Sequence, residues 1–248
     1  SGLYNPGSTI KPLIGMAALE EKIVDPSDTI NDCVKLTVPN QYNLGDSYTF
    51  DNWRVEYGPF NLKRAIANSC NIYFFTVGGG HDKIKGLGAE RIARYLKDSF
   101  ADSLLNIDLP GENNGFVPTS DWKLREKGEQ WYLGDTYNIS IGQGDLLITP
   151  LWLNSYISAI ANDGSIYRPR VAQAIVDNNH EVIENFGPEL IGSLPFTPET
   201  IRIMKMAMRE TVLSGTAQIL KELPVQMAAK TGTAEVQKGR TANSSFTA

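Results

Sequence analysis

The sequence predicts an α+β fold, and three observations support this class. The segment after Ser8 repeats apolar residues with a helical period, which is typical of a helix packed on a core. Residues 171–177 and 180–186 are β-rich and flank a turn, as in a β-hairpin. Residues 227–236 are a further strand candidate. With 248 residues, of which 42% are hydrophobic, the chain can bury a core as one large domain or two small ones.

Composition excludes several classes of function. The net charge is −5 and no basic run is dense enough to follow a phosphate backbone, so no nucleic-acid partner is expected. No apolar run approaches the ~20 residues that span a bilayer. The chain has two cysteines and two histidines, far apart in sequence, so we expect no metal and no cofactor. Cys33 and Cys70 either pair or stay free, and the sequence does not decide between these states.

The first predicted helix starts near Ser8 and ends near Val24. Pro6 and Gly7 interrupt the preceding chain, and serine is a common residue at a helix N-cap. Apolar residues then recur on one face, at Ile10, Leu13, Ile14, Ala17 and Ala18. Ser8 and Lys11 are three residues apart and share one face, which suits a serine nucleophile activated by a lysine.

The pattern Ser-x-x-Lys is weak evidence by itself, because a chain of this length contains about one by chance. A second copy occurs at Ser120 and Lys123. It leads into a polar stretch without a core face, so we interpret it as a solvated helix start.

The first half of the chain otherwise predicts loops and helices. Residues 27–59 are interpreted as loops with a small hairpin (strand pieces 33–38 and 47–50) that covers one side of the site. Helices are expected over 61–68 and 89–100. The apolar run 72–77 fits a core strand or a buried helix equally well, and the glycines at 78–80 are interpreted as a helix end.

The second half contains a turn, two capped helices and the hairpin. Glycines punctuate a turn over 138–145, and Thr149 with Pro150 starts a helix that runs to Ala161. Asn178 and Asn179 can supply the turn of the predicted hairpin. Thr197 caps another helix, and a short helix over 217–220 follows.

Three short motifs occur in a fixed order along the chain. They are Ser8-x-x-Lys11, Ser69-x-Asn71 and Lys230-Thr231-Gly232, the motif set of penicillin-binding proteins and serine β-lactamases. Lys-Thr-Gly is expected in only about one chain in ten of this length. Its glycine is unusual inside a strand unless something approaches the backbone closely.

The chain resembles the transpeptidase domain of class B penicillin-binding proteins, most closely the elongation type. The resemblance covers nearly the whole chain and includes residues 6–12, 108–112, 140–144 with 149–151, and 230–235. It implies an antiparallel sheet flanked by helices, with Lys-Thr-Gly on an inner edge strand. It also implies a serine acyl-transferase that cross-links D-Ala-D-Ala stem peptides of peptidoglycan and is acylated by β-lactam antibiotics at Ser8.

The chemistry assigns a role to each motif residue. Lys11 can take the Ser8 proton only when neutral, and burial together with the charge of Lys230 would lower its pKa. The Ser69 hydroxyl can relay that proton to the leaving amine. Asn71 offers an amide to Lys11 and to the substrate.

The Lys-Thr-Gly strand is the expected substrate-binding edge. Lys230 and Thr233 suit a terminal carboxylate, and Gly232, beside Thr231, leaves room for an extended peptide. The resemblance further implies an oxyanion hole made by the backbone N–H groups of Ser8 and Thr233.

Several related functions remain open. A D,D-carboxypeptidase differs only in the acceptor. A serine β-lactamase would need a base for deacylation, and here Cys70 occupies the middle of the Ser-x-Asn triplet. The 158 residues between Asn71 and Lys230 suit a penicillin-binding protein better. A non-catalytic module, either a β-lactam sensor or a scaffold for cell-wall assembly partners, is the alternative from another class. The intact motif residues argue against a decayed site, but a sensor would keep them as well.

We interpret residues 1–248 as one incomplete transpeptidase domain. In the family, strands of the sheet precede the Ser-x-x-Lys helix and follow the Lys-Thr-Gly strand. The 7 residues before Ser8 and the 16 after Gly232 are not expected to supply them, so residues 1–248 alone should expose apolar surface and be weakly stable or inactive. The family also implies cell-wall elongation proteins as partners and an N-terminal anchor at the extracytoplasmic face of the bacterial cytoplasmic membrane. A glycosyltransferase domain, as in class A, is left open.

Overall fold

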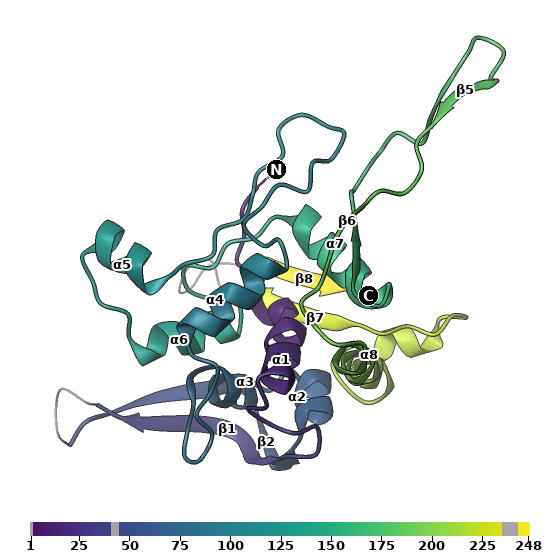
Figure 1. The fold of residues 1–248 in the computed structure, drawn as a ribbon. Helices are drawn as coiled ribbons and strands as arrows, with labels where there is room; N and C mark the ends of the chain where they lie inside the picture. Colours follow the sequence, from purple (N-terminus) through teal and green to yellow (C-terminus); the bar gives the residue numbers. More distant parts are fainter. Residues whose placement is uncertain (1, 41–44, 235–242) are drawn as a thin grey trace.

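Helix α1 (Lys11–Glu20) occupies the centre of the molecule in the computed structural model, which describes residues 2–40, 45–234 and 243–248 (Figure 1). The 3-10 turn η1 (Gly7–Ile10) leads into it. Every residue from Lys11 to Ala18 is buried, so the prediction of a single apolar face is wrong. Helices pack around α1 on several sides, and the helix ends at Glu20, before the expected Val24.

Four surrounding helices begin or end where local sequence signals predict. They are α2 (Leu62–Asn68), α4 (Ala89–Asp98), α7 (Pro150–Ala161) and α8 (Pro198–Leu213). The side chains of Asn61, Thr149 and Thr197 each accept a hydrogen bond from a backbone N–H in the first turn of the helix they precede. Such caps satisfy N–H groups that have no partner inside the helix.

The apolar run 72–77, which fitted a strand or a helix equally well, lies in a buried helix, α3 (Asn71–Gly79). All residues from Ile72 to Gly78 are buried, which explains why no one-sided pattern marks the helix. Gly78 and Gly79 lie against α6 (Leu133–Ser140), where an added Cβ at Gly78 would fall 1.9 Å from the Ser140 Oγ. Gly80 ends α3, as the interpretation of the three glycines predicts.

The region expected to be loops with a small hairpin is a long antiparallel hairpin. Strand β1 (Ile30–Pro39) pairs with β2 (Ser47–Phe60). Most side chains on both strands are exposed or half-buried. This accounts for the polar sequence of the region, which shows only short stretches typical of strands. The ladder is irregular around Cys33, where pairing shifts on both sides.

Helix α5 (Ser120–Lys127) carries the second Ser-x-x-Lys pattern, and one expectation for it is wrong. Ser120 lies near the helix start, as predicted, and its hydroxyl donates to Glu90 at 2.7 Å. Lys123, however, is buried, and its Nζ donates to Asp135 at 2.7 Å. The stretch therefore contains a buried lysine that is paired with a half-buried aspartate, which a pattern of apolar residues cannot reveal.

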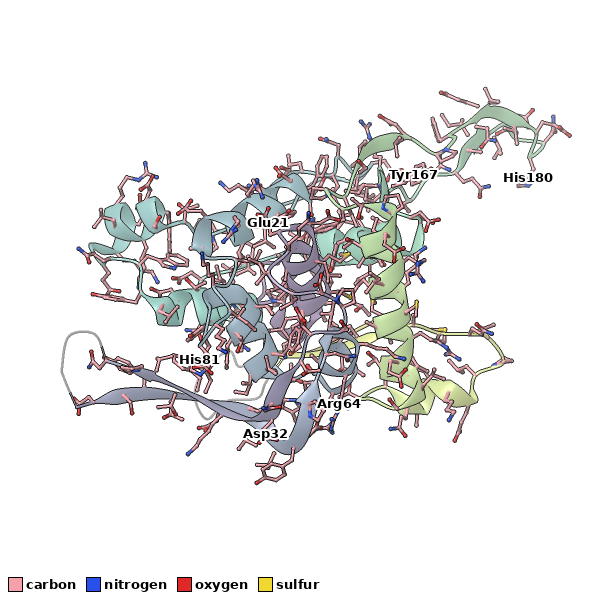
Figure 2. The ribbon with its side chains drawn as sticks, turned by 60° about the horizontal axis from the view of Figure 1, so that its bottom comes forward. Glu21, Asp32, Arg64, His81, Tyr167 and His180 are labelled. Carbon is pink, nitrogen blue, oxygen red and sulfur yellow. A yellow bond between two sulfur atoms is a disulfide. The ribbon has the colours of Figure 1, made fainter. Side chains whose placement is uncertain are left out.

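A slender arm projects from the body between α7 and α8 (Figure 1). At its base β3 (Ser165–Tyr167) pairs with β6 (Leu190–Ser193), and beyond them β4 (Ala174–Val176) pairs with β5 (Val182–Asn185). This confirms the predicted hairpin. The left-handed turn residue is His180, with φ 66°, and not the two asparagines (Figure 2).

The Lys-Thr-Gly strand is β7 (Lys230–Ala234), which follows the 3-10 helix η2 (Gln218–Glu222). The predicted strand covered 227–236, of which 235 and 236 lie outside the described residues. Strand β8 (Asn243–Thr247) pairs antiparallel with β7. The residues after Gly232 thus do supply one strand of the sheet, contrary to expectation, and the α+β fold of helices and antiparallel strands is confirmed.

Across the part of the chain that the structure describes, no helix is both long and apolar enough to cross a membrane.

Candidate active site

Ser8 lies on a turn that is held by close backbone contacts. Gly7 has φ +56° and donates its N–H to the Gly142 carbonyl at 2.9 Å. A Cβ at Gly7 would lie 2.6 Å from the Thr233 carbonyl oxygen, and a Cβ at Gly142 would lie 2.1 Å from the Gly7 carbonyl oxygen. Glycine at both positions lets three backbone segments touch. These contacts place Ser8 between strand β7 and the glycine-punctuated turn after α6.

Lys11 is fully buried one turn after Ser8. Its Nζ donates to the Asn71 Oδ1 at 2.6 Å, to the Ser69 carbonyl at 2.8 Å and to the Ser69 Oγ at 3.2 Å. The predicted grouping of the first two motifs is therefore present in the structure, although their residues are about 60 positions apart in sequence.

Lys230 reaches the same serine from the opposite side. Its Nζ donates to the Ser69 Oγ at 2.9 Å and to the Thr231 carbonyl at 2.7 Å. The residue is fully buried, so its amino group contacts the Ser69 turn and not the open cleft. This differs from the expectation that Lys230 faces a substrate carboxylate.

Burial lowers the pKa of both lysines. The pKa of Lys11 falls well below its ordinary value, mainly because burial penalises the charged form and further because Lys230 is positively charged nearby. Burial lowers the pKa of Lys230 to about 7. An amino group that is neutral near neutral pH can accept a proton, as a general base must.

Ser69 has a strained backbone, at the junction of α2 and α3. Its φ of 56° and ψ of 40° are left-handed, which costs a residue with a side chain about 1–2 kcal/mol. Strain of this kind persists where the surroundings over-determine the conformation, and it gathers at functional sites. Here it turns the Ser69 hydroxyl and carbonyl toward Lys11.

A cleft of about 670 Å³ opens above these groups. Of the predicted site residues, Ser8, Ser69, Asn71, Thr231 and Thr233 line it. Lys11, Lys230 and Gly232 do not line it and are buried. Successive side chains of a strand point to opposite faces. Along β7, Thr231 and Thr233 therefore face the cleft, whereas Lys230 and Gly232 lie on the buried side.

The cleft also has lining residues that sequence reasoning did not single out. Trp53 of β2 lines one wall and donates its Nε1–H to the Ser69 carbonyl at 3.2 Å. Thr216 shares a hydrogen bond of 2.7 Å with the Thr231 hydroxyl. Asn138 and Gln143 add amide groups. Only the last two had a signal in the sequence, because they lie in the glycine-punctuated stretch 138–145.

The two cysteines form a disulfide bond, which resolves a question that the sequence left open. Cys33 on β1 and Cys70, between Ser69 and Asn71, are joined with their Cα atoms 5.8 Å apart. Both residues are fully buried.

A family model described as the penicillin-binding protein transpeptidase domain matches residues 1–248. The chain belongs to this family. The resemblance drawn from the three motifs is thereby confirmed.

Individual relatives are named as peptidoglycan D,D-transpeptidases. The peptidoglycan D,D-transpeptidase MrdA of Acinetobacter baumannii is 33% identical over 240 residues, which cover 95% of this chain and 34% of that protein. The chain thus spans about a third of the relative's length.

Two solved structures share the fold. Penicillin-binding protein PBP2 of Pseudomonas aeruginosa in complex with WCK 5153 has a TM-score of 0.81 at 28% identity, covering 99% of this chain and 52% of that one. PBP2 of Helicobacter pylori in complex with MreC has a TM-score of 0.78 at 27% identity, covering 99% and 42%.

Proposed function

We propose that the chain is the catalytic domain of a peptidoglycan D,D-transpeptidase that works through an acyl-enzyme on Ser8. The observation that carries the proposal is the pair of buried lysines, Lys11 and Lys230, whose amino groups both donate to the Ser69 hydroxyl beneath the cleft that Ser8 lines. Membership of the family and similarity to MrdA support it.

Acylation begins when neutral Lys11 accepts the proton of the Ser8 hydroxyl. The serine Oγ then forms a bond to the carbonyl carbon between the two D-Ala residues of a stem peptide. The backbone N–H groups of Ser8 and Thr233 stabilise the oxyanion of the tetrahedral intermediate. The proton passes from Lys11 through the Ser69 hydroxyl to the terminal D-Ala, which leaves as an amine.

Transfer reverses these proton movements. The amine of a second stem peptide attacks the ester on Ser8, its proton returns through Ser69 and Lys11, and the serine hydroxyl is restored. The new amide is the cross-link. A β-lactam ring acylates Ser8 by the same first step.

The cleft supports a peptide donor. The Thr216, Thr231 and Thr233 hydroxyls suit the donor's terminal carboxylate, the role that the sequence gave partly to Lys230. The Asn71, Asn138 and Gln143 amides can pair with peptide groups of the substrate.

Labelling of the full-length protein with a fluorescent penicillin tests the function. We expect label on the wild type, none on Ser8→Ala, and normal label on Ser120→Ala, which removes the serine of the second Ser-x-x-Lys. Label retained by Ser8→Ala would refute the assignment. A bound label that is hydrolysed within minutes would favour a β-lactamase, and release of D-Ala to water without cross-linking would favour a carboxypeptidase.

We also propose that the protein works at the extracytoplasmic face of the cytoplasmic membrane, held by an N-terminal anchor, together with cell-wall elongation proteins. The similarity to an H. pylori PBP2 whose structure was solved with MreC supports such a partner. Co-purification of the full-length protein with an MreC-like protein checks this.

A further inference from the structure

The irregular part of the β1–β2 hairpin lies directly beside the Ser69–Asn71 turn. Where β1 has one residue, Val34, between two paired positions, β2 has four, residues 52–55. Bulges of this kind bend a strand and redirect its side chains, and they are common next to active sites. This bulge brings Cys33, Asn52 and Trp53 to the turn.

A covalent bond is the first connection. The Cys33–Cys70 disulfide ties β1 to the middle residue of the Ser-x-Asn triplet. Cys70 is also the N-cap of α3, where its Sγ accepts the Tyr73 N–H at 3.4 Å. The bond therefore fixes the point at which the turn enters the helix.

The side-chain amide of Asn52 is the second connection. Its Oδ1 accepts the backbone N–H of Asn71 at 2.9 Å, and its Nδ2 donates to the Cys33 carbonyl at 3.1 Å. One amide thus joins Cys33, at one end of the disulfide, to Asn71, the residue after Cys70 at the other end. The Arg54 carbonyl accepts from the same Nδ2 at 2.7 Å, which fixes the orientation of the amide.

These connections act on Lys11 through its partners. The Asn71 Oδ1 and the Ser69 carbonyl accept the two shortest hydrogen bonds of Lys11, and Trp53 donates to that same carbonyl. Ser69 holds a left-handed conformation that its own sequence disfavours. The hairpin supplies the outside constraint that such a conformation needs.

We propose that the Cys33–Cys70 disulfide and Asn52 are positioning residues for the acylation of Ser8, because they hold the Ser69–Asn71 turn at hydrogen-bonding distance from Lys11. The proposal rests on the proposed function and adds to it residues outside the three motifs. None of these three residues reacts with the substrate.

The test compares acylation kinetics of the full-length wild type and of the double variant Cys33→Ala/Cys70→Ser. Serine at position 70 keeps a good N-cap, so the start of α3 is preserved. Saturation kinetics with a fluorescent penicillin separate binding before acylation from the acylation step. We expect the acylation rate constant to fall about 10- to 100-fold, as for other small misplacements of catalytic groups, with binding little changed.

Thr37→Val is the matched control within the same hairpin. It removes the exposed 3.2 Å hydrogen bond between the Thr37 and Thr49 hydroxyls, away from the turn. We expect normal acylation, which separates general loosening of the hairpin from loss of the turn.

Reduction with dithiothreitol gives a reversible version of the same change. Two electrons and two protons convert the disulfide into two thiols, as alkylation and mass measurement verify. The acylation rate constant of the wild type should fall on reduction and recover on reoxidation. That of Cys33→Ala/Cys70→Ser should not change with dithiothreitol.

Asn52→Ala provides an independent variant that leaves the disulfide intact. It should also lower the acylation rate constant. If Asn52 and the disulfide act on the same turn, the triple variant Cys33→Ala/Cys70→Ser/Asn52→Ala should slow acylation by much less than the product of the separate effects.

An unchanged acylation rate constant in Cys33→Ala/Cys70→Ser and Asn52→Ala would overturn the proposal. The proposal would also be overturned if circular dichroism showed that Cys33→Ala/Cys70→Ser loses folded structure to the same extent as it loses labelling. The disulfide would then serve global stability. Absence of label on oxidised wild type would instead contradict the proposed function.

Discussion

Lys11 and Lys230 lie in surroundings that are unusual for lysine. Lysine is among the side chains that are least often fully buried. Both amino groups nevertheless lie without exposed surface, and both donate to the Ser69 Oγ. Their burial favours the neutral amine that proton transfer requires.

Replacing Lys11 by Gln should slow acylation of Ser8 by about 10²- to 10⁴-fold, the usual contribution of a general base. The measurement is the acylation rate constant with a fluorescent penicillin. Lys123→Gln is the control, because it removes a buried lysine from the second Ser-x-x-Lys and should lower stability only. Less than a tenfold decrease for Lys11→Gln would assign the base to another group.

The pH profile of acylation should follow the deprotonation of Lys11. Because the neutral amine is the reactive form, the rate rises with pH, and its midpoint lies well below the ordinary lysine pKa of 10.5. Lys230→Gln removes a neighbouring positive charge, so the pKa of Lys11 rises and the midpoint moves to higher pH. Profiles of the acylation rate from pH 5 to 10, each normalised to its maximum, measure the shift. A midpoint that moves down or stays in place would contradict this coupling.

At the scale of elements, the turn that carries Ser8 depends on a backbone contact between η1 and the turn after α6. Gly142 has φ +77°, and an added Cβ there would lie 2.1 Å from the Gly7 carbonyl oxygen. Such crowding cannot be relieved by a side-chain rotation, so the Ser8 turn must shift.

Gly142→Ala should therefore lower both stability and the acylation rate. Gly128→Ala is the matched control, because Gly128 has a similar φ of +68° but no atom within 4 Å of the added Cβ. It should cost about 1–2 kcal/mol of stability from backbone strain and leave acylation unchanged. Urea unfolding together with penicillin labelling separates the two effects, and equal behaviour of the variants would disprove the contact.

Sequence reasoning succeeded for elements that carry a local chemical signal. Thr149 and Thr197 mark the starts of α7 and α8 through side chains that act within one turn. It was less complete where burial hides the pattern. The sequence predicts α1 with one apolar face and leaves the run within α3 as a strand or a helix, because nearly all residues of both helices are buried. It also underestimated β1 and β2, because strands with exposed faces need few apolar residues.

At the scale of the whole molecule, the motif residues were predictable and their supports were not. Three short patterns in order identified the residues that surround Ser69. Asn52, Trp53 and Thr216 carry no such pattern, and they meet the site through contacts between residues 15 to 19 positions apart. The disulfide likewise depends on the hairpin's path, which the spacing of two cysteines cannot determine.

We expect the arm to add little to the stability of the body, because its apolar side chains are exposed. Ile183 is 68% exposed near its far end, whereas Ile160 of α7 is 2% exposed. Ile183→Ala should change the free energy of unfolding by no more than about 0.5 kcal/mol, while Ile160→Ala should cost about 2–5 kcal/mol. Urea unfolding measures both. A loss above 1 kcal/mol for Ile183→Ala would show that the arm packs on the body.

The hydrogen bond between Lys230 and Ser69 spans 161 residues of sequence, which sets the time at which the site can exist. At 5–20 residues per second, a ribosome needs on the order of 10–30 s to add the second of these residues after the first. Throughout that interval the growing chain already carries Ser8, Lys11 and Ser69 but lacks the strand that closes over them. The reactive serine is therefore assembled into an active site only after Lys230 has been added to the chain.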